Sequence, residues 1–256
     1  MVIYMNNINM AFLLTSIAGL STLIGTIPIF IKFKNNNKII CSSLAFASGV
    51  MICVSITDLI PESIKMLRTH FNSLITITLS FLFILIGILI STLISKFIPD
   101  NTNKYYTNTN LYKVGIISML AIIIHNIPEG IATFISTTKS PSLGISLTIA
   151  IALHNIPEGI SISVPIYYST KSKLKALMYT LVSALSEPLG AIITYLFLLK
   201  YINNIILGLM FSLIAGLMLQ ISLIELIPES INKNYPKLTK TFFIIGIIFM
   251  LLKFFF

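Results

Sequence analysis

Residues 125–130 read HNIPEG, and residues 154–159 read the same six letters. Each copy stands near the middle of a long apolar stretch of the chain. At about 100° per helical residue, the His, Asn and Glu of one copy fall within about 100° of one another around the helix axis. The repeated motif therefore predicts two helices that each present an imidazole, a carboxamide and a carboxylate on one face.

Apolar stretches of this kind fill the whole chain. Of its 256 residues, 56% are hydrophobic and only 10% are charged, and the mean hydropathy is +0.96. A helix needs about 20 apolar residues to cross a bilayer. The composition therefore predicts an all-α polytopic membrane protein, built as a single transmembrane domain over residues 1–256. It excludes an ordinary soluble enzyme, a disordered chain and a nucleic-acid-binding protein.

Hydropathy and helix-breaking residues divide the chain into eight predicted transmembrane helices. Their approximate ranges are 9–31, 39–60, 74–95, 114–136, 143–166, 176–199, 202–227 and 239–256. The segment 97–112 is rich in Asn, Thr and Tyr, and we interpret it as a flexible cytoplasmic loop.

The lysines and the one arginine indicate the orientation in the membrane. Twelve of the 17 basic residues fall in alternate connections, beginning with Lys32, Lys34 and Lys38 after the first predicted helix. Positive charge favours the cytoplasmic side. With eight helices, this pattern predicts that both termini lie on the outer side of the cell membrane.

The motifs also suggest an internal repeat. DLIPES at 58–63 is echoed by ELIPES at 225–230, and the two HNIPEG copies stand on consecutive, hence antiparallel, predicted helices. Matching motifs on antiparallel helices predict an inverted repeat of three, two and three helices, an arrangement common in transporters.

Carboxylates inside apolar stretches are the strongest functional signal. A charge in hydrocarbon costs several kcal/mol unless it is paired, hydrated or neutralised, and a purely structural membrane protein has no reason to retain several. His125, His154 and Glu187 lie near the middle of the predicted helices 114–136, 143–166 and 176–199, and Glu129 and Glu158 each stand four residues after one of the histidines. These three helices therefore place polar residues at a similar depth in the membrane.

Imidazole nitrogens together with carboxylate oxygens suit Zn²⁺, and they also suit Fe²⁺, Mn²⁺ and Co²⁺. The predicted metal ligands are the seven polar residues near mid-membrane: His125, Asn126, Glu129, His154, Asn155, Glu158 and Glu187. Seven side chains exceed the needs of one tetrahedral ion, so we expect a site for one or two ions, the second bridged by glutamates. We expect the metal to be a transported substrate, and we expect no cofactor.

A second set of residues could line a pathway to this site. Four acids lie toward the ends of predicted helices, and one methionine could act as a soft transient ligand, although packing is its simpler role. These residues are Met51, Asp58, Glu62, Glu225 and Glu229.

With these motifs in view, the sequence resembles the ZIP (Zrt/Irt-like) family of metal-ion permeases, and within it the bacterial zinc transporters. The resemblance rests on the paired HNIPEG motifs and the glutamate of SEPLG at 186–190. It implies that the seven residues above are metal ligands and that the ion enters between the helices carrying DLIPES and HNIPEG. It further implies that one set of helices slides against another. Many members of the family carry a histidine-rich loop, whereas segment 97–112 has no histidine.

The resemblance and the residues together predict uptake of divalent metal into the cytoplasm, most naturally Zn²⁺, with a broad ion range. Two alternatives stay open: an intramembrane zinc hydrolase and a proton or organic-cation transporter. The hydrolase motif HExxH has a glutamate directly after its first histidine, where this chain has asparagine. Expected partners are divalent ions and the lipid bilayer, with a homodimer as an open alternative and nucleic acid excluded.

Overall fold

The computed structural model describes residues 2–32, 34–97, 109–198, 201 and 203–252, and all regular structure in these ranges is helical. The α-helices are α1 (Val2–Ser21), α2 (Asn36–Val54), α3 (Ile60–Leu67), α4 (Ser73–Phe97), α5 (Thr109–Lys139), α6 (Pro141–Thr170), α7 (Lys173–Ile193), α8 (Asn204–Gln220), α9 (Ile227–Ile231) and α10 (Pro236–Leu251). The other helical segments are the 3₁₀ helix η1 (Thr22–Phe30) and the π-helical segments η2 (Ser55–Leu59), η3 (Thr194–Leu198) and η4 (Ile221–Leu226).

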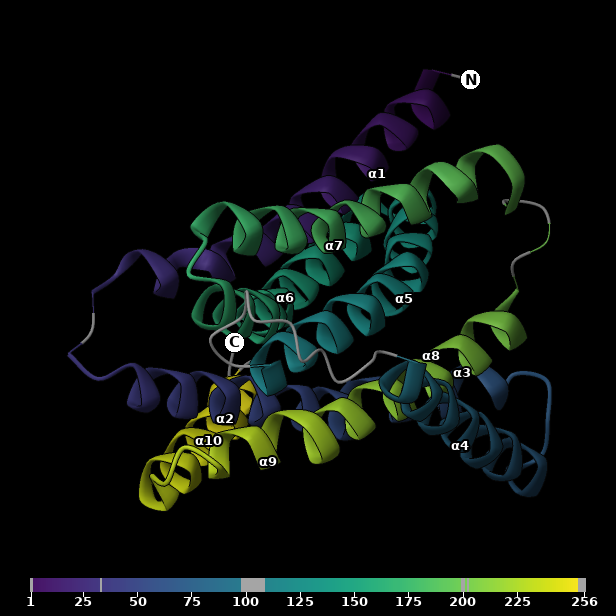
Figure 1. The fold of residues 1–256 in the computed structure, drawn as a ribbon. Coiled ribbons are helices and arrows are strands. Elements are labelled where there is room, and N and C mark those ends of the chain that lie inside the picture. The colour runs from purple at the N-terminus through teal and green to yellow at the C-terminus, as the bar shows by residue number, and fades with distance from the viewer. Residues whose placement is uncertain (1, 33, 98–108, 199–200, 202, 253–256) are drawn as a thin grey trace.

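The helices form two layers (Figure 1). We call α1, η1, α5, α6 and α7 the upper layer, because these elements pack on one another at the top of the view. The lower layer consists of α2, η2, α3, α4, α8, η4, α9 and α10, in which α10 packs on α2 and α4 packs on α8. The layers meet chiefly where α2 contacts α6 and where α5 contacts α8.

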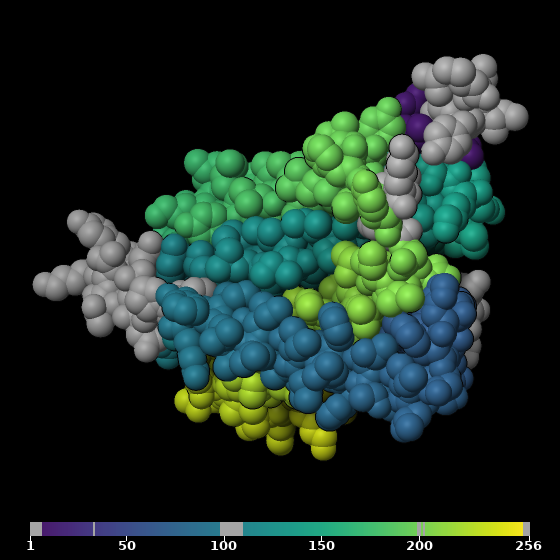
Figure 2. Space-filling view, turned by 90° about the vertical axis from the view of Figure 1, so that its right-hand side faces the viewer, coloured from purple at the N-terminus to yellow at the C-terminus, as the bar shows by residue number. Residues whose placement is uncertain are grey.

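Helix α4 illustrates how the chain suits a membrane. Figure 2 shows it, in blue, on the outside of the lower layer. Its buried positions are small: Thr76, Ser80, Gly87 and Ser91. Large apolar side chains such as Leu74 and Phe81 are exposed at 76% and 62%. Membrane helices typically place small residues between helices and large apolar residues outside, because contact of leucine with lipid has no free-energy cost.

A proline follows each of the two π-helical segments in the lower layer. Both IPES sequences place a proline where its missing N–H leaves the helix one hydrogen bond short. The helix widens just before it, so that the N–H of Ile60 donates to Ser55 O and the N–H of Ile227 donates to Ser222 O. The same change does not occur in the HNIPEG helices, since α5 and α6 continue as α-helices through Pro128 and Pro157.

Seven helical stretches among the described residues are long and apolar enough to cross a membrane. The eighth predicted helix, 239–256, corresponds to α10, which has 16 residues here, while 253–256 lie outside the described residues. Several helices extend beyond the predicted apolar ranges, since polar residues continue a helix into the interface. The predicted loop 97–112 is wrong at both ends, because Phe97 ends α4 and α5 begins at Thr109; residues 98–108 lie outside the described part.

Candidate metal site

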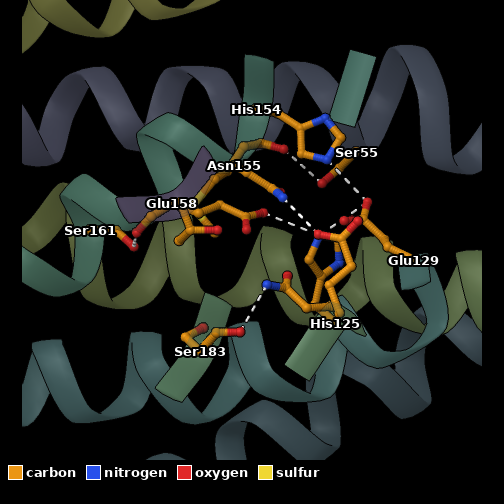
Figure 3. A network of polar contacts seen from close by, with 12 residues as sticks. Ser55, His125, Glu129, His154, Asn155, Glu158, Ser161 and Ser183 are labelled. Atoms are coloured by element: carbon orange, nitrogen blue, oxygen red, sulfur yellow. Dashed lines mark hydrogen bonds and ion pairs between the residues drawn. The ribbon is translucent and has the colours of Figure 1, made fainter. Parts of the chain in front are cut away.

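Four side chains from the two HNIPEG copies converge between α5 and α6 (Figure 3). His154 Nε2 lies 3.1 Å from Glu129 Oε1, and His125 Nε2 lies 3.3 Å from the same oxygen. His125 Nε2 also lies 3.1 Å from Glu158 Oε1. Glu129 thus links both imidazoles, and His125 links both glutamates.

The spacing of these atoms suits a metal ion. His125, Glu129 and His154 each offer a ligand atom within 4.8 Å of the others. Ligands bound about 2.0–2.2 Å from a tetrahedral Zn²⁺ lie roughly 3.3–3.6 Å from one another. The N···O separations of 3.1–3.3 Å in the cluster are close to the lower of these values. All four residues are buried.

The two asparagines use their amide nitrogens within the protein and leave their amide oxygens for a ligand. Asn126 Nδ2 donates to Ser183 O at 3.3 Å, and Asn155 Nδ2 donates at 2.9 Å both to Ala18 O and to Glu187 Oε2. Asn126 Oδ1, Asn155 Oδ1 and Glu187 Oε1 are buried and lack a hydrogen-bond partner among the described residues. Buried oxygens left in this way are costly unless a ligand binds them.

Glycines bring the supporting helices close to the cluster. A Cβ on Gly130 of α5 would overlap the carbonyl oxygen of Glu187, and a Cβ on Gly190 of α7 would overlap that of Ile127. Gly159 of α6 lies against Thr22 O of η1 in the same manner. The final glycine of each HNIPEG copy therefore allows another helix to approach the motif, which positions Glu187 and the Ala18 carbonyl beside the asparagines.

A cavity of about 460 Å³ connects part of this cluster with the DLIPES segment. Its lining residues include the buried Glu129 and His154 and also Asp58 and Glu62. We call this cavity the vestibule. Glu62 also pairs with Lys65 at 3.2 Å. The structure thus brings Asp58 and Glu62 toward the central site, though not into the cluster.

The ELIPES acids belong to a separate cavity of about 240 Å³, lined in part by Ser95, Lys113, Glu225 and Glu229. The seven central residues, all of which the structure describes, do not line it. Ser95 Oγ donates to Glu225 Oε1 at 2.7 Å, and Glu229 forms an ion pair with Lys233. The structure therefore separates Glu225 and Glu229 from the central cluster.

Met51 is fully buried in the main hydrophobic core and lines neither of these two cavities. Packing accounts for its position. The motifs of the sequence do not indicate the contribution of α1, whose Ala18 carbonyl accepts a hydrogen bond from Asn155. Backbone groups leave no signature in the sequence, although the small residues of SIAGLSTLIG at 16–25 indicate close packing.

Comparisons with known proteins identify relatives of this chain. The family model described as ZIP Zinc transporter matches residues 8–109 and 101–253. The chain is 41% identical over 258 residues to the zinc transporter ZupT of Clostridium perfringens, covering 88% of each protein. It is 41% identical over 229 residues to the ZupT of Streptococcus mutans, covering 86% of this chain and 87% of that protein. It is 37% identical over 259 residues to the ZupT of Campylobacter jejuni, with coverages of 89% and 88%.

Proposed function

The chain belongs to the ZIP zinc transporter family, and from this premise we propose that it carries Zn²⁺ across the cell membrane into the cytoplasm. It is a multi-pass membrane protein and a transporter rather than an enzyme. The observation that carries the proposal is the buried cluster of two imidazoles and two carboxylates contributed by α5 and α6.

The cluster binds the transported ion through His125, Glu129, His154 and Glu158. A second ion can use the amide oxygens of Asn126 and Asn155 together with Glu187, with Glu129 and Glu158 bridging the two. The three glutamates supply three negative charges, so two divalent ions leave only one charge uncompensated. The orphaned oxygens of the asparagines and Glu187 support this arrangement.

The distribution of lysines supports entrance through the vestibule from outside the cell. Under the eight-helix arrangement with both termini outside, DLIPES lies near the external surface and ELIPES near the cytoplasmic surface. The ion then passes Asp58 and Glu62, reaches the cluster, and leaves past Glu225 and Glu229. The vestibule reaches Glu129 and His154, whereas the second cavity is separate from the cluster.

Release of the ion requires that the proposed ligands move away from the vestibule and come into contact with the cavity lined by Glu225 and Glu229. All seven proposed ligands belong to the upper layer, and all four pathway acids belong to the lower layer. We infer that the upper layer slides past the lower one and carries the ion with it. The proposed ligands and the pathway acids belong to different layers. This separation favours a sliding of one layer against the other, rather than a rearrangement of side chains alone.

An inverted repeat of three, two and three helices accounts for matched features of the lower layer. The backbone carbonyls of Ser55 and Ser222 accept the N–H groups of Ile60 and Ile227, which follow the two π-helical segments. Each serine stands three residues before an acid. Gly49 of α2 abuts a carbonyl of α10, as Gly216 of α8 abuts a carbonyl of α4. These two glycines each stand nine residues before the same acids.

The ion range extends to Fe²⁺, Mn²⁺ and Co²⁺ in this proposal, because nitrogen and oxygen ligands of the cluster accept all four metals. The hydrolase alternative lacks its base. The residues after His125 and His154 are asparagines, and their amide groups already donate to backbone carbonyls. Neither can take a proton from water.

Uptake of ⁶⁵Zn into proteoliposomes tests the proposal. Glu129→Ala and Glu158→Ala should each lower the rate by about 100-fold, because each removes a charged ligand from the shared site. Asp100→Asn is a matched carboxylate control, because Asp100 is the one of the eight acids that the proposal places neither at the site nor on the pathway. It should retain most of the wild-type rate.

Each variant must be present at the same amount in the vesicles and must melt at a similar temperature. Wild-type uptake by a folded Glu129→Ala or Glu158→Ala protein would rule out the shared site. Transport of protons or an organic cation without any metal uptake would instead support the alternative transporter.

A further inference from the structure

Helices α9 and α10 enclose a groove that has no part in the proposed ion pathway. The two helices lie beside each other in the lower layer (Figure 1). The groove has a volume of about 360 Å³ and is lined by Ile227, Ile231, Pro236, Thr239, Lys240 and Phe243. Its walls are two helical stripes, because the α9 residues are spaced by four and the α10 residues by four and three.

Almost every group in the groove is apolar. The hydroxyl of Thr239 is already engaged, since its Oγ1 lies 3.0 Å from Ser230 Oγ and 3.1 Å from Cys41 Sγ. Lys240 is exposed. Among the described residues that line the groove, Lys240 therefore supplies the one polar side chain left for an occupant.

The lysines near α9 and α10 differ in whether a carboxylate neutralises them. Lys233 pairs with Glu229, but no carboxylate among the described residues lies within ion-pair distance of Lys237 or Lys240. Lys240 stands four residues into α10, which corresponds to a rise of about 6 Å. A lysine at that depth can extend its ammonium group toward the lipid phosphates while its stem stays on apolar surface.

We propose that this groove binds an anionic phospholipid, with one acyl chain between Ile231 and Phe243 and the phosphate at Lys240. An apolar trough with a single unpaired cation at its rim complements an amphiphile with a negative headgroup. Neutral lipids fill the trough equally well but gain little from the lysine. A free phosphate ion gains nothing from the apolar walls.

Tryptophan fluorescence can test the proposal directly, because the chain contains no tryptophan. Phe243→Trp places one reporter in the groove, and brominated acyl chains quench tryptophan on contact. The protein is reconstituted in mixed vesicles of phosphatidylcholine and phosphatidylglycerol, in which either one or the other lipid carries the bromine. We expect about a fivefold preference for phosphatidylglycerol at the introduced tryptophan, the effect of one lysine near an anionic lipid.

Phe81→Trp is the matched control, since Phe81 is an exposed phenylalanine on α4, away from the groove. It should be quenched equally by both lipids. Adding Lys240→Gln to Phe243→Trp should bring the preference close to one. Lys34→Gln, the same change of charge elsewhere, should leave the preference unchanged.

Equal quenching of the groove reporter by both lipids, with Lys240 present, would overturn the proposal. Absence of quenching by either lipid would also overturn it, because a second copy of the chain would then cover the groove. If Phe243→Trp does not fold, Ile231→Trp reports from the opposite wall, where Ile231 is 51% exposed. No metal enters the assay, so its outcome is independent of zinc transport.

Discussion

The imidazoles of His125 and His154 meet at Glu129, and His125 also lies beside Glu158. Their ring centroids lie 6.3 Å apart, and the Nε2 atom of each faces the same oxygen of Glu129. Each ring is buried with its Nδ1 unpaired among the described residues. The proposed site therefore combines two nitrogen ligands with two carboxylates, and the balance between nitrogen and oxygen ligands should set the preference among metals.

Replacing one imidazole should change ion preference more than total activity. We expect His154→Gln to lower Zn²⁺ uptake more than Mn²⁺ uptake, because an amide oxygen is a harder ligand and suits manganese better than it suits zinc. The loss of rate should be smaller than for Glu158→Ala, since a neutral ligand is lost rather than a charge. Uptake of both ions in one competition assay gives the ratio, and an unchanged Zn:Mn ratio would refute the role of His154 in selectivity.

At the scale of helices, the site depends on how closely α5, α6, α7 and α1 can pack. Gly130 of α5 and Gly190 of α7 face each other's helix backbone, and Gly25 of η1 and Gly159 of α6 do the same. The Ser163 hydroxyl adds a hydrogen bond of 2.8 Å to Gly25 O. These contacts fix the distance between the helices that carry the ligands, so the ligand geometry is a consequence of packing between helices.

A single methyl group at the closest contact should therefore disturb the site. Gly130→Ala places a Cβ against the Glu187 carbonyl, and relieving the overlap must move α5 from α7. Overpacking of this kind costs about 1–3 kcal/mol. We expect a lower melting temperature in detergent and a clear loss of zinc uptake.

Gly115→Ala is the matched control within α5. Its Cβ would lie 2.7 Å from Ile166 Cδ1 and 2.8 Å from Ile166 Cγ1, so the close contact is with a side chain rather than with a carbonyl of another helix. Alanine also favours the helix over glycine by about 1 kcal/mol. Gly115→Ala should lose less stability and less uptake than Gly130→Ala, and an equal loss in the two variants would mean that the Glu187 contact has no particular role.

At the scale of the whole molecule, the two layers divide the proposed work. The upper layer holds the seven proposed ligands, and the lower layer presents one acidic motif to each of the two cavities described above. Of these two cavities, the vestibule is the one that reaches the cluster, through Glu129 and His154. Which side of the membrane the vestibule faces is therefore the property that decides the direction in which this conformation accepts an ion.

Cysteine labelling on intact cells should establish that direction. We expect Lys139→Cys, at the end of α5, to react with an impermeant maleimide, and Lys173→Cys, at the start of α7, to be protected. The distribution of lysines is the physical reason, since most of them gather in the connections assigned to the cytoplasm. The native Cys41 and Cys53 are buried, so the unmodified chain serves as a background control. Reaction at position 173 but not at position 139 would reverse the orientation.

The sequence alone predicted the class of the protein, the approximate helices and the chemistry of its motifs. These properties follow from local patterns: apolar length for membrane helices, and spacing within HNIPEG for a shared helix face. The resemblance to the metal permeases also rests on these local motifs. They also failed locally, since residues 109–112 read as a polar loop although they form the first turn of α5.

The tertiary structure alone decided how these parts meet. No local pattern shows that Ala18 O and Ser183 O would orient the two asparagines, because backbone carbonyls are the same in every residue. A local pattern also does not show that Asp58 and Glu62 share a cavity with Glu129 and His154, whereas Glu225 and Glu229 line a different one. Both outcomes depend on which helices lie in contact, and that is fixed by packing between segments far apart in the chain.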